Sequence, residues 1–283
     1  MSTFRFLRIR EILAQPWLIT AEGYDAVASL VDRHAAMTTA DFAAMKMDGL
    51  FDVPPQMAID KETGIADIPI QGVIGKGLSK IEKSCGAVGT EDITSNLALA
   101  MADPSVKGIL LNIASPGGTV NGTPEVASAI REAAGRKPIV AFTDSLMGSA
   151  AYWMGSQASM VIASESASVG SIGVYIPVTD MSKRAEMAGV KVDIVKNKEG
   201  TFKGMGYAGT TLTEDQRGHL QERVDEIFAM FAGAVQSART VPASAMRGQS
   251  FLGAEARKQG LTDDVGGLNL ALRSLMALMP LKR

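Results

Sequence analysis

Short β-type segments alternate with helical patterns along the middle of the chain, and this alternation limits the folds open to it. Apolar runs typical of strands occur at 66–74, 106–113, 138–142, 160–163 and 169–175. Helical patterns lie between several of them, at 92–101, 123–134 and 150–157. Strands that alternate with short helices in this way predict stacked ββα or βαβ units, and therefore an α/β fold.

The first 62 residues differ from this pattern. They carry helical periodicities at 24–37 and 39–47 and then a loop with two adjacent prolines. We interpret 1–62 as an N-terminal helical arm that packs on the main domain or on a neighbouring subunit. The main domain is then expected over 63–283.

The last third of the chain is predicted to begin with a short helix at 182–188 and a strand at 191–195. A long helix should start at Thr213, because Thr-Glu-Asp-Gln matches a capping box. Its apolar stripe fits core packing or a subunit interface. A short helix, a turn and a last helix complete the predicted elements.

The composition excludes several classes of function. The 283 residues are 46% hydrophobic and 20% charged, which suits a globular core, and the net charge of −2 gives no reason to expect nucleic acid. A single cysteine, Cys85, rules out an intrachain disulfide and fits a reducing compartment. We expect no metal site, no signal peptide and no membrane span, because the necessary clusters and apolar runs do not occur.

Ser149 is the first candidate for chemistry. It lies where the apolar run 138–142 gives way to a helical pattern, between Gly148 and Ala150, so little bulk shields its hydroxyl. Serine is also a preferred helix N-cap, and its surroundings alone favour that simpler interpretation. A nucleophilic serine would need a base within hydrogen-bond reach.

The candidates for that base are few. His219 lies among charged residues on the long helix and His34 lies in the arm, and neither resembles the buried imidazole of a Ser-His-Asp triad. A lysine can act instead when burial lowers its pKa. Lys203, between Phe202 and a glycine-rich turn, is easier to desolvate than Lys196 or Lys198, although a surface loop lysine remains the simpler interpretation.

Gly117 and Gly118 could supply an oxyanion hole. They follow a buried-type strand in Ser-Pro-Gly-Gly, and glycines let backbone N–H groups approach a ligand. An ordinary Pro-Gly turn is the alternative. The Gly-x-Ser-x-Gly and Ser-x-x-Lys motifs of other serine enzymes are absent, and the Gly-x-Gly-x-x-Gly match at 204–209 lacks the strand that should precede it.

Several segments taken together, in their order and spacing, resemble family S49 serine peptidases. This is the signal peptide peptidase A type, which includes phage capsid assembly (prohead) proteases. The similarity covers about residues 65–275 and rests on the segments at 115–118, 148–153, 168–174, 200–203, 251–256 and 260–267. Each motif is weak alone, and their order makes the resemblance specific.

The resemblance implies a ClpP/crotonase-like fold and a Ser-Lys dyad. By position, Ser149 is the nucleophile and Lys203 the general base. Gly117 and Gly118 form the oxyanion hole, and Ser171 lies close to the dyad in a supporting role. No cofactor is implied. The expected partners are a polypeptide substrate and further copies of the chain in a homo-oligomer.

Alternatives remain for the biological role. The soluble-type arm, with Gln15-Pro16-Trp17, resembles phage members encoded with head genes. We therefore expect a capsid or scaffold protein as substrate and a location in the host cytoplasm or prohead. Some such members continue into a C-terminal scaffold, whereas this sequence stops at Arg283. The alternatives are a signal-peptide-peptidase-like enzyme that degrades peptides, a crotonase-like acyl-CoA enzyme, and a scaffolding protein with a decayed site.

Overall fold

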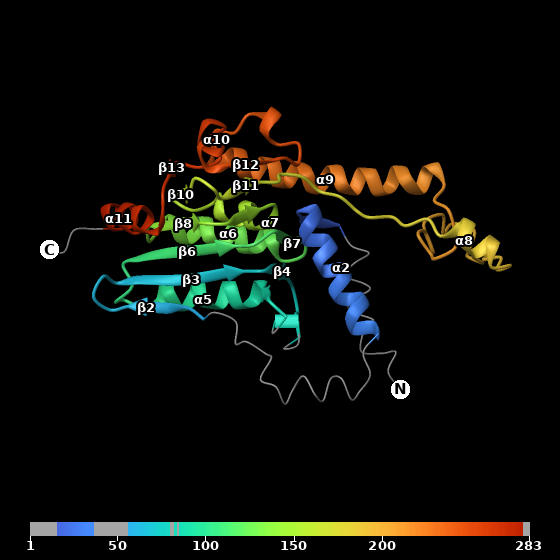
Figure 1. Cartoon of the computed structure of the whole chain (residues 1–283), viewed down its shortest axis with the longest axis horizontal. Coiled ribbons are helices and arrows are strands. Elements are labelled where there is room, and N and C mark those ends of the chain that lie inside the picture. Colours follow the sequence, from blue (N-terminus) through green and yellow to red (C-terminus); the bar gives the residue numbers. More distant parts are fainter. Residues whose placement is uncertain (1–15, 37–55, 80–81, 84, 280–283) are drawn as a thin grey trace.

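A six-stranded sheet forms the centre of the computed structural model, which describes residues 16–36, 56–79, 82–83 and 85–279 (Figure 1). Neighbouring strands pair in parallel except for the edge strand β2, which is antiparallel to β3. From one edge to the other, the strands are β13 (Asp264–Val265), β10 (Met160–Ala163), β8 (Ile139–Thr143), β6 (Gly108–Ala114), β3 (Ile65–Gln71) and β2 (Ala58–Asp60).

Short strands that follow the long ones build two further sheets. A four-stranded sheet has the order β1 (Trp17–Ile19), β7 (Gly117–Thr119), β4 (Val73–Gly75) and β5 (Ala87–Gly89). A three-stranded sheet has the order β12 (Ser250–Leu252), β11 (Ser168–Gly170) and β9 (Leu146–Gly148). These two sheets lie at the carboxyl ends of the long strands.

Three helices complete the repeated units: α5 (Thr90–Ala102), α6 (Thr123–Ala134) and α7 (Ala150–Gly155). Each follows a long strand and its short companion, so the order ββα recurs along the chain, with β5 as an addition in the first unit. This order agrees with the ClpP/crotonase-like fold that the resemblance implies. The α/β prediction is confirmed.

The central sheet is covered on both faces. In β6, Ile109 and Leu111 point into the core that contains α5, α6 and α7, whereas Leu110 points to the other face. That second face is covered by α11 (Leu268–Leu278) through Ala271 and Leu275. Burial on both faces explains why the sequence of this strand reads as continuous hydrophobic residues.

Several helices and strands differ from their predicted boundaries. The apolar run 169–175 is a strand only to Gly170, because Gly170 and Ser171 both take positive φ and the chain leaves the sheet. The strand predicted at 191–195 is wrong: its mostly exposed residues have no neighbouring strand in the described part of the chain. The helix at 123–134 is confirmed, and Gly122 occupies its N-cap position.

Two segments of the predicted N-terminal arm are described. Helix α2 (Ala21–Ala36) agrees with the expected helix at 24–37, whereas the pattern at 39–47 lies outside the described residues. Residues 17–19 form β1, a strand that the sequence analysis did not anticipate, and they pair with β7 of the main body. The division of the chain at residue 62 stays a prediction.

Helix α9 (Glu214–Ala238) is the longest helix in the described part of the chain. Its predicted capping box is present, with Thr213 Oγ1 accepting from the Gln216 amide at 3.3 Å and the Gln216 side chain accepting from the Thr213 amide at 3.2 Å. Figure 1 shows its N-terminal end projecting beyond the sheets, next to α8 (Ser182–Met187). No helix among the described residues is long and apolar enough to cross a membrane.

Arg239, directly after α9, ties α7 to the C-terminal part of the chain. Its guanidinium donates to the carbonyls of Ser156 at 3.0 Å and Ala158 at 2.5 Å, just beyond α7. It also pairs with Asp263 at 2.5 Å, and its side chain is only 8% exposed. Nearby, η2 (Ala243–Ala245) and α10 (Gly253–Lys258) complete the fold.

Arg239→Ala should lower the free energy of unfolding by about 2–4 kcal/mol, because it leaves two carbonyls and a carboxylate without their donor. Urea denaturation measures the change. Arg257→Ala is the matched control: its pair with Asp264 is exposed, so the loss should stay below about 1 kcal/mol. Equal losses in the two variants would contradict the role given to Arg239.

Candidate active site

The backbone at Ser149 is strained. Ser149 joins β9 to α7 with φ 52° and ψ −115°, a conformation that residues with a side chain seldom adopt. Its amide donates to the Gly170 carbonyl at 2.7 Å, and its own carbonyl accepts from the Trp153 amide at 2.8 Å. The neighbouring sheet and the helix together impose the turn.

The Ser149 hydroxyl is buried and unengaged. The residue is 1% exposed, and its Oγ has no hydrogen-bond partner among the described residues. Ser149 is the N-cap of α7 by position, but its side chain makes no capping bond. A buried hydroxyl without a partner costs stability, so the capping interpretation does not account for it. No hydrogen bond among the described residues therefore commits this hydroxyl to holding the fold.

The glycines of β7 lie against this serine. A Cβ placed on Gly117 would lie 3.0 Å from the Ser149 Cβ, and Gly117 has φ +105°. A Cβ on Gly118 would lie 1.9 Å from the Ile74 carbonyl oxygen, so no larger residue fits there. The Gly117 amide already donates to Ser115 Oγ at 3.1 Å. Gly118 is opposite Leu18 of β1, so its amide faces that strand rather than a side chain, and it remains the candidate for donating to an oxyanion.

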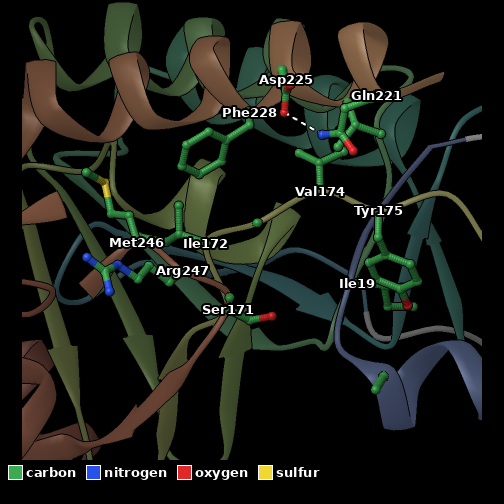
Figure 2. Close-up of a pocket in the computed structure, with 14 residues that line it drawn as sticks. Ile19, Ser171, Ile172, Val174, Tyr175, Gln221, Asp225, Phe228, Met246 and Arg247 are labelled. Atoms are coloured by element: carbon green, nitrogen blue, oxygen red, sulfur yellow. Dashed lines mark hydrogen bonds between the residues drawn. The ribbon is translucent and has the colours of Figure 1, made fainter. Parts of the chain in front are cut away.

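Ser171 reaches the same place from the next strand. Strand β11 pairs in parallel with β9, and Gly170 is opposite Gly148. Ser171 has φ 54°, and its amide donates to the Gln249 carbonyl at 2.8 Å. It lines two pockets, of about 480 and 680 Å³. Figure 2 shows the smaller one, which Ser171 lines together with Ile19 and Tyr175.

The structure of one chain does not bring Lys203 to Ser149. Lys203 is exposed in a turn beside the N-terminal end of α9, where the Phe202 ring stacks on His219 at 4.5 Å. Helix α7 contacts α9 much further along, where Trp153 stacks on Phe231 at 4.7 Å. Phe231 lies twelve residues beyond His219, which is about 18 Å along a helix. The base therefore has to come from elsewhere or from a rearranged segment.

The sequence analysis missed the contribution of β1 to this region. Trp17, Leu18 and Ile19 are 1%, 0% and 3% exposed, and they lie between β7 and Tyr175. Three apolar residues are too few for a periodicity to show. The available signal was a short apolar run directly before Thr20, which is a good N-cap residue for the following helix.

Ser149→Gly should be more stable than Ser149→Ala by about 1 kcal/mol, because glycine adopts a positive φ without steric cost. Thermal unfolding at one protein concentration measures the difference. The matched control is Ser156, which has φ −62°; there the Gly variant should be the less stable of the two. The same ranking at both positions would show that the Ser149 backbone is not strained.

Comparisons with known proteins agree on a family. The model of peptidase family S49 matches residues 131–282, a range that includes Ser149, Ser171 and Lys203. The capsid assembly protease C of Escherichia phage lambda is 27% identical over 92% of this chain and 60% of its own length. The head-tail preconnector protein of Enterobacteria phage P21 is 31% identical over 71% of this chain and 40% of its own.

Cellular enzymes match as well. Protease 4 of Salmonella typhi is 27% identical over 92% of this chain and 42% of its own length. The chain thus spans about 40–60% of the length of these relatives. A crystal structure of an enoyl-CoA hydratase/isomerase family member overlays 80% of this chain and 76% of its own with 18% identity and a TM-score of 0.41. The assignment of the fold depends on the ββα order of the chain and not on this overlay.

Proposed function

The chain belongs to peptidase family S49, and on that premise we propose that it is a serine endopeptidase with Ser149 as nucleophile and Lys203 as general base. The observation that carries the proposal is the Ser149 hydroxyl, which is buried, has no hydrogen-bond partner in the described part of the chain, and lies on a strained turn against the glycines of β7. Strained backbone conformations cluster at active sites, where the surrounding structure imposes them. Family membership also favours a peptidase over an acyl-CoA enzyme.

The proposed reaction begins when the neutral amine of Lys203 takes the proton of Ser149 Oγ, which then attacks the substrate carbonyl carbon. The Gly118 amide donates to the oxygen that becomes negative. The intermediate collapses when the C–N bond breaks and the leaving amine takes the proton from Lys203. Water, activated by the same lysine, then hydrolyses the acyl-enzyme.

Lys203 is proposed to come from a second copy of the chain. Its own Ser149 is distant, and the segment that carries it exposes large apolar side chains. Met187 is 90% exposed, Val195 98% and Tyr207 60%. Exposure of several large apolar side chains on one segment supports its use as an interface. Burial at such an interface also favours the neutral amine that a lysine base requires.

Ser149→Ala and Lys203→Ala should each abolish cleavage of a protein substrate and leave the fold intact. A one-to-one mixture, co-refolded or co-expressed, should recover about a quarter of wild-type activity, because one interface in four then pairs an intact serine with an intact lysine from a neighbour. Hydrolysis of fluorescent casein measures both results.

Lys198→Ala is the matched control, because Lys198 occupies the same exposed segment and should be dispensable. A mixture that stays inactive while both variants assemble normally would refute the contribution from a neighbour. Full activity of Lys203→Ala, or fluorophosphonate labelling of a serine other than Ser149, would refute the dyad itself.

The proposed substrate is a phage capsid or scaffold protein, met in the host cytoplasm or in the prohead. Support comes from two phage relatives, one of them named as a capsid assembly protease. The cellular protease relatives support the alternative, a degradative peptidase. Co-expression with the major capsid protein of the same genome, followed by intact mass measurement, separates the two roles. Defined truncations of the capsid protein support the head-maturation role. An unchanged capsid mass together with general casein cleavage supports the degradative peptidase.

A further inference from the structure

We infer that the chain's own strand β1 occupies the groove in which a polypeptide substrate binds, and that substrate enters by displacing it. This inference rests on the proposed peptidase function, since it assumes that Ser149 is the nucleophile. Residues 17–20 then compete with the substrate for the groove. The substrate should resemble the strand that it replaces.

Backbone pairing places β1 between two partners. On one side it is antiparallel to β7, with Leu18 opposite Gly118 and Ile19 opposite Gly117. On the other side, the Trp17 amide donates to the Tyr175 carbonyl at 2.9 Å and the Tyr175 amide donates to the Trp17 carbonyl at 3.3 Å. Main-chain pairing to the edge of a sheet is how an extended peptide binds by β-augmentation, and β1 has such pairing on both of its edges.

The pairing also directs β1 at the candidate oxyanion donor. Because Trp17 turns both backbone groups to Tyr175, the alternation of a strand turns those of Leu18 toward β7 and Gly118. The Leu18 carbonyl oxygen lies 2.1 Å from where a Cβ of Gly117 would be. A substrate carbonyl that used the Gly118 amide would therefore have to replace this part of β1.

β1 runs in the direction expected for the part of a substrate that precedes the cleaved bond, which is its acyl side. The strand runs toward Ser149, and its next residue, Thr20, has its Cγ2 3.0 Å from where a Cβ of Gly148 would be. The Thr20 amide donates to the Pro116 carbonyl at 3.0 Å. The chain then turns into α2, and the Thr20 carbonyl accepts from the Tyr24 amide at 3.0 Å. That carbonyl is committed to the helix, so β1 resembles a substrate that stops short of a cleavable bond.

The contacts of β1 leave polar atoms unsatisfied, as expected of a segment that can leave. Trp17 Nε1 and the Tyr175 hydroxyl are buried without partners among the described residues. Burial raises the pKa of Tyr175 to about 12, so its hydroxyl stays a neutral donor, and no described residue accepts from it. Most of the described side chains of α2 are exposed or half-buried, so β1 rather than α2 anchors the segment.

The replaced strand indicates the chemistry of the substrate. Trp17, Leu18 and Ile19 are all almost completely buried, so the groove accepts consecutive apolar side chains in an extended conformation. The pocket of about 480 Å³ begins at Ile19 and continues along Tyr175 and Phe228, which are also shown in Figure 2. A preferred substrate would therefore have an unfolded apolar segment on the acyl side of the cleaved bond.

A reversible disulfide tests the inference in the full chain. Trp17 and Thr119 are opposite each other in a pair that does not share hydrogen bonds, in which side chains approach most closely. The Trp17→Cys, Thr119→Cys variant is compared in its oxidised and reduced forms. In the oxidised form, both the labelling of Ser149 by a fluorophosphonate probe and the cleavage of fluorescent casein should be slower by about tenfold or more. Trp17→Cys alone should not respond to reductant.

A second variant keeps the test independent of the crosslink. Trp17→Ala weakens β1 and should raise the rate of Ser149 labelling above that of the wild type, while Trp153→Phe, on α7, should not. Equal rates in the oxidised and reduced double variant, with the disulfide verified by peptide mass, would overturn the inference. So would a Trp17→Ala variant that stays folded and labels more slowly. If Ser149 is labelled in no form, the proposed function itself has failed.

Discussion

The backbone hydrogen bonds around the β9–α7 junction hold the candidate site together. The Ser115 amide donates to the Leu146 carbonyl at 2.8 Å, and the Gly148 amide donates back to Ser115 at 3.0 Å. The Ser149 amide, bound to Gly170, closes the same region from the other side. With its neighbours held by three strands, Ser149 has no freedom to relax to an ordinary φ.

The strain at Ser149 is of the order of 1–3 kcal/mol, and α7 offsets it. All six residues of α7 are buried, and Trp153 stacks on Phe231 of α9 with an angle of 5° between the rings. Tyr152 adds a hydrogen bond from its hydroxyl to the Leu261 carbonyl at 2.9 Å. Burying one large side chain contributes about 1.5–3 kcal/mol, so the packing of this one helix outweighs the strain of the turn that begins it.

One chain builds only part of the proposed chemistry. The serine, the glycines of β7 and Ser171 come together through the parallel sheets, whereas Lys203 lies on a segment that extends away from them (Figure 1). The groove beside Ser149 is filled by β1 of the same chain. Under our proposals, activity then depends on two events outside the fold of the isolated chain: the arrival of a neighbour's lysine and the departure of β1.

The sequence by itself determined the α/β class and the position of the candidate nucleophile, because strand and helix periodicities and a motif order are local properties of the chain. Its periodicities left ββα and βαβ units open. It also located Gly117, Gly118 and Ser171 as candidates. Only the tertiary structure decided that the Ser149 hydroxyl has no partner among the described residues, that Lys203 is distant within one chain, and that residues 17–19 form a strand. Each of these depends on contacts between segments far apart in sequence. A three-residue strand such as β1 exists only because β7 and Tyr175 supply the groups with which its backbone pairs.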